Sequence, residues 1–286
     1  MSIIVNHLSY IYNPDTLYEK RALDDVSFKI EDGEYIGLVG HTGCGKSTLV
    51  QHLNGLIKVM EGGIYYNGRD ISEKDFSMKE LRGKVGLVFQ YPEHQLFEED
   101  VFSDVCFGPK NLGLSKKEVE LRAYDALKLV GIRDEQFYIS PFDLSGGEKR
   151  RVAIAGVLAM QPDVLILDEP TAGLDPKGRE ELLSLIDDLR IKRKMTVIIV
   201  SHSMDDMAEH VERLIVLNKG KVILDGPTRD VFSQKSLLND IGLEVPVVTG
   251  VLAGLAKKGM PVRTDRLTVG EAADEIMKVF NSRGAR

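Results

Sequence analysis

The chain is poor in cysteine and lacks tryptophan, and it has neither an excess of basic residues nor a long apolar run. Its two cysteines, Cys44 and Cys106, cannot form a disulfide framework, so we expect a reducing, cytosolic compartment. Lys and Arg total 37 against 44 Asp and Glu, a net charge of −7, which leaves no basic footprint for nucleic acid or anionic lipid. The apolar stretch from Val247 to Ala256 is well short of the ~18 residues that a bilayer span needs, and the first residues lack a secretory-signal pattern. If a membrane matters to this protein, we expect another chain to cross it.

The remaining composition is that of a folded globular protein. Hydrophobic residues make up 43% and charged residues 28% of the 286 positions, which argues against disordered and collagen-like classes. Because the length exceeds the roughly 100–150 residues of a typical domain, we expect one large domain with an appendage, or two domains.

Short apolar segments predict two kinds of sheet. The first thirty residues alternate apolar and polar positions on either side of a turn signal at Asn13-Pro14-Asp15, which indicates an N-terminal antiparallel β-subdomain. Later runs are almost continuously apolar, as in strands covered on both faces of a parallel sheet: Tyr35 to Gly40, Val85 to Phe89, Val164 to Leu167 and Thr196 to Val200. The predicted core is therefore α/β with a mostly parallel sheet.

Helix-start patterns predict an inserted helical subdomain. Ser77 and Glu80, and again Ser115 and Glu118, have the spacing of a capping box, which seats a helix N-terminus. We expect this subdomain at about 91–150.

The C-terminal part of the chain is expected to be separate from the core. Gly226-Pro227 interrupts the strand pattern, so the predicted division is 1–226 for the main domain and 227–286 for a short α-helical C-terminal region. Helices are expected at about 247–258 and 269–281, the second opened by the capping-box pattern of Thr268 and Glu271.

A glycine-rich loop follows the first buried strand and precedes a helical pattern. Gly40-His41-Thr42-Gly43-Cys44-Gly45-Lys46-Ser47 fits G-x-x-x-x-G-K-[ST]. The glycines let backbone N–H groups point at a β-phosphate, and the positive end of the helix adds to the field. Lys46 then reaches the β- and γ-phosphates, and the Ser47 hydroxyl ligates Mg²⁺. The sequence therefore predicts a phosphate-binding loop in preference to a chance glycine-rich turn.

Two acids stand at the carboxyl end of a later strand. Asp168 and Glu169 follow Val164 to Leu167, at the sheet edge where open α/β proteins bind ligands. Asp168 suits a Mg²⁺ contact through water, and Glu169 suits a base that polarises the attacking water. Taken alone, an Asp-Glu-Pro sequence equally ends a strand, since Pro170 cannot continue the ladder.

A second Gly-rich element precedes an apolar helix. Leu144-Ser145-Gly146-Gly147-Glu148 offers Ser and Gly donors at a helix N-terminus, a potential anion site. By itself this element is weak, because Ser-Gly-Gly is also a common N-cap arrangement.

In this order, the motifs resemble those of the nucleotide-binding subunits of ATP-binding cassette transporters, which are P-loop NTPases, over about residues 3–235. The resemblance implies that Gln90 is the Q-loop glutamine, that Asp175 ends the D-loop and that His202 is the switch histidine. It places Tyr12 on the adenine, although Tyr12 or the nearby Tyr10 also suits ordinary strand packing.

The same resemblance implies ATP and Mg²⁺ as cofactors. Nucleotide-binding positions are implied at Tyr12, Gly40, His41, Thr42, Gly43, Cys44, Gly45, Lys46, Ser47, Thr48, Gln90, Ser145, Gly146, Gly147, Glu148, Asp168 and Asp175. Catalytic roles are implied for Glu169, His202, Lys46 and Gln90, and Mg²⁺ contacts for Ser47, Gln90 and Asp168. Two such subunits are implied to close head to tail, with Ser145, Gly146 and Gly147 of one on the γ-phosphate held by the other. Glu148 departs from the family, which usually has Gln there.

A longer segment resembles one branch of that family. Phe89-Gln90-Tyr91-Pro92-Glu93-His94-Gln95-Leu96-Phe97, with the intact Thr171 to Pro176 and Lys149 to Gly156, looks like the second of the two paralogous ATPases of energy-coupling-factor importers, which take up vitamins or transition-metal ions. The resemblance implies a transmembrane coupling subunit that docks near Tyr91 to Asp100, and a substrate-binding membrane subunit contacted indirectly. The acids Glu98 to Asp100 alternatively form a plain solvated loop.

These resemblances imply a peripheral location at the cytoplasmic face of the cell membrane and pairing with a second ATPase, identical or paralogous. The helix at 269–281 places Ala272, Ile276, Val279 and Phe280 on one stripe, which suits packing on its own domain or on that partner. A soluble cassette ATPase acting on nucleic acid or ribosomes is the alternative; the acidic charge and the lack of a coiled-coil insertion disfavour it, and we expect no nucleic acid partner. A regulatory cassette without turnover is disfavoured by Glu169 and His202, and a kinase or small GTPase does not need Leu144 to Glu148.

Overall fold

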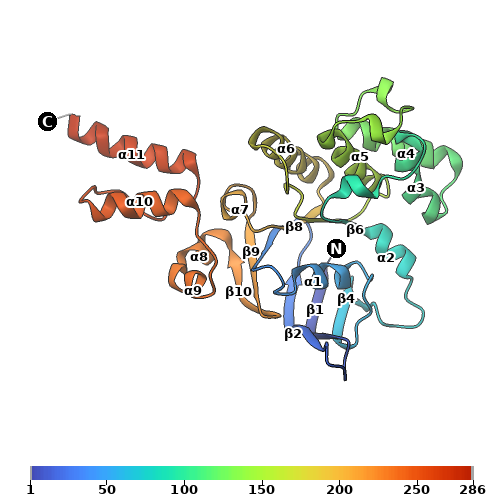
Figure 1. Ribbon diagram of the computed structural model, residues 1–286, viewed down its shortest axis with the longest axis horizontal. Helices are drawn as coiled ribbons and strands as arrows, with labels where there is room; N and C mark the ends of the chain where they lie inside the picture. The colour runs from blue at the N-terminus through green and yellow to red at the C-terminus, as the bar shows by residue number, and fades with distance from the viewer. Residues whose placement is uncertain (1, 285–286) are drawn as a thin grey trace.

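The computed structural model describes residues 2–284 and contains two sheets flanked by helices (Figure 1). The larger sheet has six strands in the order β10-β9-β3-β8-β7-β6. Its members are β3 (Tyr35–Val39), β6 (Val85–Val88), β7 (Val164–Asp168), β8 (Thr196–Val200), β9 (Arg213–Asn218) and β10 (Lys221–Pro227). All neighbours are parallel except β10, which runs antiparallel to β9. The predicted α/β core with a mostly parallel sheet is confirmed.

Both faces of this sheet are buried, which explains the continuous apolar runs. Along β3, Tyr35 and Val39 belong to one apolar core, and Ile36 and Leu38 to a second. Since successive side chains of a strand point to opposite faces, the sheet separates the two cores.

The N-terminal sheet is antiparallel, in the order β2-β1-β4-β5. Its strands are β1 (Ile3–Tyr12), β2 (Lys20–Ile30), β4 (Glu61–Tyr66) and β5 (Arg69–Asp70). The first two were predicted; β4 and β5 were not, because they return to this sheet after the first helix of the core.

Helices α3 (Val101–Leu112), α4 (Lys116–Leu129) and α5 (Gly146–Leu158) pack together as the inserted helical subdomain. Asp100 caps α3, and Ser115 and Glu118 form the expected capping box on α4. A 3₁₀ helix, η1 (Pro92–Gln95), leads into the subdomain from β6. The other core helices are α1 (Lys46–Leu53), α2 (Met78–Lys84), α6 (Pro176–Arg193) and α7 (Met204–His210).

Within the described part of the chain, four helices follow β10. The short α8 (Thr228–Ser233) and α9 (Lys235–Asp240) were not predicted, whereas α10 (Val247–Lys257) and α11 (Val269–Gly284) match the expected positions. The last two lie side by side and project from the rest of the molecule (Figure 1). No helix within residues 2–284 is long and apolar enough to cross a bilayer.

The α10–α11 hairpin has a small apolar core of its own. Leu252 of α10 packs with Ala272, Ile276 and Val279 of α11, whereas Phe280 is 56% exposed. Most of the predicted stripe therefore packs against the neighbouring helix of the same tail.

Candidate functional site

The phosphate-loop sequence forms the turn between β3 and α1. Gly45, the N-cap of α1, has a φ of 113°, and a Cβ there would collide with the carbonyl oxygen of Ala22. Only glycine readily adopts this positive φ and also leaves room for the Ala22 carbonyl oxygen. Gly45 therefore allows the loop to lie tightly against β2. Lys46 is 9% exposed, and its ammonium group donates to the carbonyl oxygens of Gly40 and His41, at 2.6 and 3.0 Å.

This loop forms one wall of a cavity of about 300 Å³ that gathers residues from six parts of the chain. Of the residues implied to be functional, it is lined by Tyr12, Thr42, Gly43, Gly45, Lys46, Ser47, Thr48, Gln90, Asp168, Glu169 and His202. The strand ends of β7 and β8 and the loop after β6 meet here because the carboxyl ends of parallel strands share one sheet edge.

The side chains of Asp168 and Ser47 supply a pair of oxygen atoms suited to Mg²⁺. Asp168 is 7% exposed, and burial raises the pKa of its carboxyl group, while a hydrogen bond from Ser47 and the charge of Lys46 oppose that rise. Hydroxyl and carboxylate oxygens are hard ligands that Mg²⁺ accepts, with phosphate oxygens and water completing its octahedron. No group of three or more His, Cys, Asp or Glu residues among positions 2–284 forms a self-sufficient metal site. The donor set thus fits a cation that is held jointly by protein and nucleotide.

Glu169 and His202 both line the cavity, and their side chains are in contact. The His202 Nδ1 atom lies 2.9 Å from the Glu169 carboxylate, and the Glu169 N–H donates to the Val200 carbonyl at 2.9 Å. The Glu169 side chain is 14% exposed and that of His202 is 76% exposed. A shielded carboxylate beside an accessible imidazole is suited to positioning a water molecule and to sensing what enters the cavity.

The structure separates the two candidate tyrosines. Tyr12 lines the cavity, and its hydroxyl lies 3.2 Å from the Thr48 hydroxyl. Tyr10 packs against the second core and meets His52 edge to face. Of the two tyrosines, Tyr12 is therefore the one whose ring is available to stack on the adenine ring of a nucleotide.

Several implied residues lie outside the cavity. Ser145, Gly146 and Gly147 begin α5, and the Asp175 carboxylate accepts from Gly178 N–H as the N-cap of α6. Within one copy of the chain, Ser145, Gly146 and Gly147 do not line the cavity that the phosphate loop of the same copy forms. The implied head-to-tail arrangement expects this, because there these residues contact the phosphate held by the other copy.

Three side chains of the implied set point elsewhere. The His41 ring contacts the Ile241 carbonyl oxygen, the Cys44 thiol is 5% exposed, and the Glu148 carboxylate accepts from the N–H and hydroxyl of Ser145. Hydrogen bonds from Ser145 and Gln136 lower the pKa of Glu148 to about 2. The negative charge of Glu148, at a position where the family usually has Gln, is thus held by hydrogen bonds at the N-terminus of α5.

Two functional candidates were missed in the sequence. Lys20 lines the cavity and was hidden at the end of a long exposed loop. Arg150, which stands between the basic residues Lys149 and Arg151, is 3% exposed and pairs with Glu93 at 2.9 Å. No local pattern in the sequence distinguishes Arg150 from its basic neighbours Lys149 and Arg151, because the packing of α5 against η1 is what buries it.

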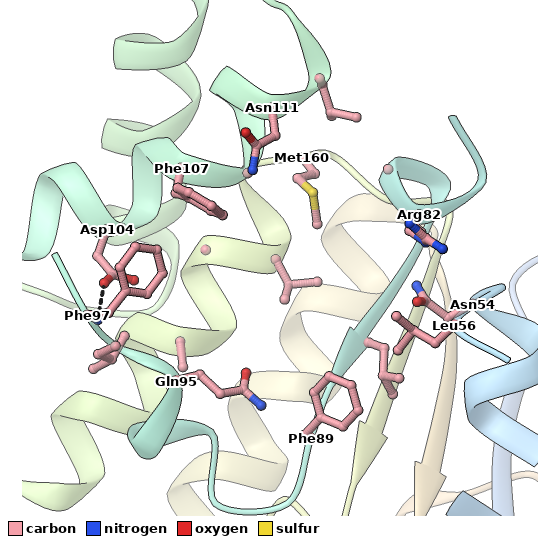
Figure 2. Close-up of a pocket in the computed structure, with 18 of the residues that line it drawn as sticks. Asn54, Leu56, Arg82, Phe89, Gln95, Phe97, Asp104, Phe107, Asn111 and Met160 are labelled. Atoms are coloured by element: carbon pink, nitrogen blue, oxygen red, sulfur yellow. Dashed lines mark hydrogen bonds between the residues drawn. The ribbon is translucent and has the colours of Figure 1, made fainter. Parts of the chain in front are cut away.

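A second, apolar groove of about 610 Å³ lies between β6 and the helical subdomain (Figure 2). Phe97 and Phe107 meet edge to face there, with centroids 4.9 Å apart, and Asp104 accepts from the Phe97 N–H at 2.8 Å. Of the predicted docking segment, Gln95, Leu96 and Phe97 line the groove, whereas Tyr91, Glu93 and Glu98 to Asp100 do not.

The fold and the cavity define an ATP-binding cassette. Residues 23–172 match the family described as ABC transporter, and the chain belongs to that family. Among solved structures, cbiO1 from Clostridium perfringens, part of the ABC transporter complex cbiONQ, is 37% identical, with a TM-score of 0.74 over 88% of this chain and 98% of that one. The ATP-binding cassette MJ0796, solved as a dimer bound to ADP and Pi, is 28% identical, with a TM-score of 0.70 over 79% of this chain and 98% of that one.

Within that family, the chain belongs with the energy-coupling factor transporter ATP-binding proteins. The protein EcfA2 of Caldanaerobacter subterraneus subsp. tengcongensis is 54% identical over 97% of both chains. EcfA2 of Clostridioides difficile is 54% identical over 99% of both.

Proposed function

We propose that this protein is the ATP-binding and ATP-hydrolysing subunit of an energy-coupling-factor importer. The observation that carries the proposal is the cavity that joins Lys46, Ser47, Asp168 and Glu169 at one sheet edge, in a chain whose relatives are named energy-coupling factor ATP-binding proteins. Vitamins or transition-metal ions are the proposed solutes, moved through a separate membrane complex.

In the proposed mechanism, the phosphate loop binds the β- and γ-phosphates and Lys46 turns from its loop carbonyls toward them. Ser47 and Asp168 would hold Mg²⁺, together with Gln90, and the ion would neutralise charge that develops on the phosphates. Glu169 orients the attacking water, and His202 holds the Glu169 carboxylate in place. Tyr12 stacks on the adenine.

Pairing completes the proposed site. Ser145, Gly146 and Gly147 lie at the N-terminus of α5, where N–H groups and the helix field favour an anion. We propose that they bind the γ-phosphate held by a second ATPase, so that hydrolysis releases the pair. The exposed stripe Val269, Met277 and Phe280 on α11 is proposed to strengthen this pairing.

The apolar groove is the proposed seat of the transmembrane coupling subunit. Its aromatic walls and the Asp104 carboxylate suit an amphipathic helix with a basic residue. Glu93 is paired with Arg150, so the acid that the groove offers to the partner is Asp104, whose Oδ2 atom also accepts from the N–H groups of Phe97 and Glu98. Docking there places the protein at the cytoplasmic face of the membrane.

Substitution of the proposed base tests the function. Glu169→Gln keeps ATP binding but lowers hydrolysis by the full complex by at least about a hundredfold, because the water loses its acceptor. Glu209→Gln, a change at an exposed carboxylate on α7, serves as the control and leaves turnover unaltered. Ordinary turnover by Glu169→Gln would contradict the assignment of the base.

A further inference from the structure

The buried guanidinium of Arg150 donates five hydrogen bonds outside the nucleotide cavity. Its Nη1 atom donates to the carbonyl oxygens of Pro170 and Ala172, each at 2.9 Å. Its Nε and Nη2 atoms donate to the Glu93 carboxylate at 2.9 to 3.2 Å. Because the side chain is 3% exposed, no water competes for these donors.

The partners of Arg150 belong to two functional segments. Residues 169–172 form one turn, closed by a hydrogen bond of 3.1 Å from the Ala172 N–H to the Glu169 carbonyl. That turn begins with the proposed catalytic base and leads into the D-loop. Glu93 lies in η1, directly before the groove residues Gln95 and Leu96. One side chain thus spans the site of hydrolysis and the edge of the docking groove.

The contacts make these segments move together. Burial alone disfavours the ionised form of Glu93, yet the hydrogen bonds and charge of Arg150 hold its pKa below the ordinary value. A guanidinium fork binds a carboxylate through two parallel N–H donors, which restricts angle as well as distance. Separation of the pair would leave a buried charge without a partner, which is strongly unfavourable. A shift of the turn at 169–172 therefore draws Glu93, and with it η1, in the same direction.

We propose that Arg150 is a positioning residue that transmits the nucleotide state of the 169–172 turn to the docking groove. This inference rests on the proposed function. In the opposite direction, a helix seated in the groove holds η1, and through Arg150 it holds the turn that orients Glu169.

A competing route runs along the chain itself. Gln90 lines the nucleotide cavity and is joined to Glu93 by the backbone, so it reaches η1 without Arg150. The two routes predict different behaviour when only the guanidinium contacts are removed. Arg150→Lys keeps the charge and an ion pair with Glu93, but an ammonium cannot also reach both carbonyl oxygens.

The test is hydrogen exchange on the full complex in the Glu169→Gln background, with and without ATP and Mg²⁺. In the parent, we expect ATP to slow exchange in residues 40–48 and in residues 91–97. In Arg150→Lys, protection of 40–48 persists and protection of 91–97 falls by at least half. Unchanged protection of 91–97 would overturn the proposal and leave Gln90 as the route. If ATP fails to protect 40–48 in the parent, the proposed function itself is wrong.

Two further variants separate transmission from plain structural support. Glu93→Gln leaves the carbonyl contacts of Arg150 in place and still accepts hydrogen bonds, so it folds, and it too reduces the protection of 91–97. Arg213→Lys is the control, because the Arg213 guanidinium also joins carboxylate and carbonyl partners from separate segments, in this case the carboxylates of Glu34 and Asp225 and the carbonyl of Lys29, away from the cavity. It leaves protection of both segments intact.

Kinetics give an independent readout. With Glu169 present, Arg150→Lys lowers the kcat of the complex about tenfold and changes KM for ATP less than twofold, since the phosphate loop is untouched. An unchanged kcat, or equal losses in Arg213→Lys, would contradict a positioning role.

Discussion

Glu169 adopts a backbone conformation that few residues with a side chain tolerate. Its φ is 50°, in the left-handed region, and its N–H bonds to Val200 on the neighbouring strand. Such conformations cost on the order of 1–3 kcal/mol and persist where the surroundings over-determine them. Here the strand end, the Arg150 contacts and the ring of His202 supply that constraint, so the carboxylate is held in place before a substrate arrives.

Glu148 provides a residue-scale prediction about pH. Its folded pKa of about 2 lies below the ordinary value of 4.5, so the ionised carboxylate stabilises the folded state above that ordinary value. This contribution is lost as the pH falls from about 4.5 toward 2. Glu148→Gln keeps a capping side chain but cannot ionise, so its melting temperature should lie furthest below that of the parent at neutral pH and converge with it below pH 4.

The measurement is thermal unfolding of both proteins across pH 3 to 7. Glu180→Gln, at an exposed position on α6, is the control, and its difference from the parent should vary less with pH. A difference for Glu148→Gln that stays constant over the range would show that its charge does not stabilise α5.

At single positions, sequence reasoning finds candidates where a motif has local spacing. Lys46, Ser47 and Asp168 were predicted from the loop and strand that carry them, and the structure brings them together in one cavity. The pairing of Arg150 with Glu93 was not predictable, because the two residues are 57 positions apart and only the packing of α5 against η1 brings them together.

At the scale of elements, the segment that leads from α9 into α10 contacts both the phosphate loop and helix α7. Ile241 contacts His41 of the phosphate loop, and the Val247 N–H donates to Asp205, in the first turn of α7, at 2.9 Å. Gly242 allows this approach: its φ is 71°, and a Cβ would lie 2.9 Å from the His41 Nε2 atom.

Replacement of Gly242 separates backbone strain from steric contact. Gly242→Ala and Gly259→Ala both force alanine into the left-handed region, which costs roughly 1–2 kcal/mol of folding free energy. Only Gly242→Ala also collides with His41, since nothing lies within 4 Å of a Cβ at Gly259. We expect a larger loss of unfolding free energy in Gly242→Ala, and weaker ATP binding in that variant alone, by denaturant titration and calorimetry. Equal losses of unfolding free energy in both variants would mean that the segment between α9 and α10 moves to relieve the contact with His41 at no cost.

The groove makes an element-scale prediction about assembly. Phe107→Ser removes half of the aromatic pair that walls it, so the chain should no longer co-purify with its membrane subunit, while ATP hydrolysis by the isolated chain changes less than about twofold. Tyr138→Ser, at an aromatic side chain that is 75% exposed and lies outside the groove, is the control. Retention of Phe107→Ser on the membrane subunit would count against docking there.

Elements were predictable where their signals are local. The capping box of Ser115 and Glu118 appears as expected, and α10 and α11 begin where their patterns begin. The strands β4 and β5 were missed because their partner, β1, lies far back in the sequence. The helices α8 and α9 are six residues each, too short to show a periodic face.

At the scale of the whole molecule, the docking groove and the α10–α11 hairpin lie at opposite ends (Figure 1). The nucleotide cavity lies on the core between them. The hairpin packs mainly on itself, and its exposed apolar residues on α11 repeat on one side. A surface of this kind is typical of protein contacts.

The hairpin predicts an effect on pairing. Replacing Met277 and Phe280 together with Ser should weaken association with the second ATPase by about tenfold or more, because burial of each such side chain contributes about 1.5–3 kcal/mol. Sedimentation velocity with ATP, in the Glu169→Gln background, measures the association. Lys278→Ser, on the opposite side of α11, is the control, and equal association of all three proteins would exclude the hairpin from the contact.

The overall architecture was predictable because buried strands, phosphate loop and helical insertion each have a recognisable pattern. The contacts between distant elements were less predictable than the architecture. A single sequence does not show that most of the apolar stripe on α11 packs against α10, or that Glu93 pairs with another residue of the same chain.

The distance between groove and hairpin bears on how a larger machine is put together. Because the proposed docking groove and the proposed pairing surface lie on different elements, occupation of one leaves the other accessible. The proposed assembly therefore requires no fixed order in which the membrane subunit and the second ATPase bind.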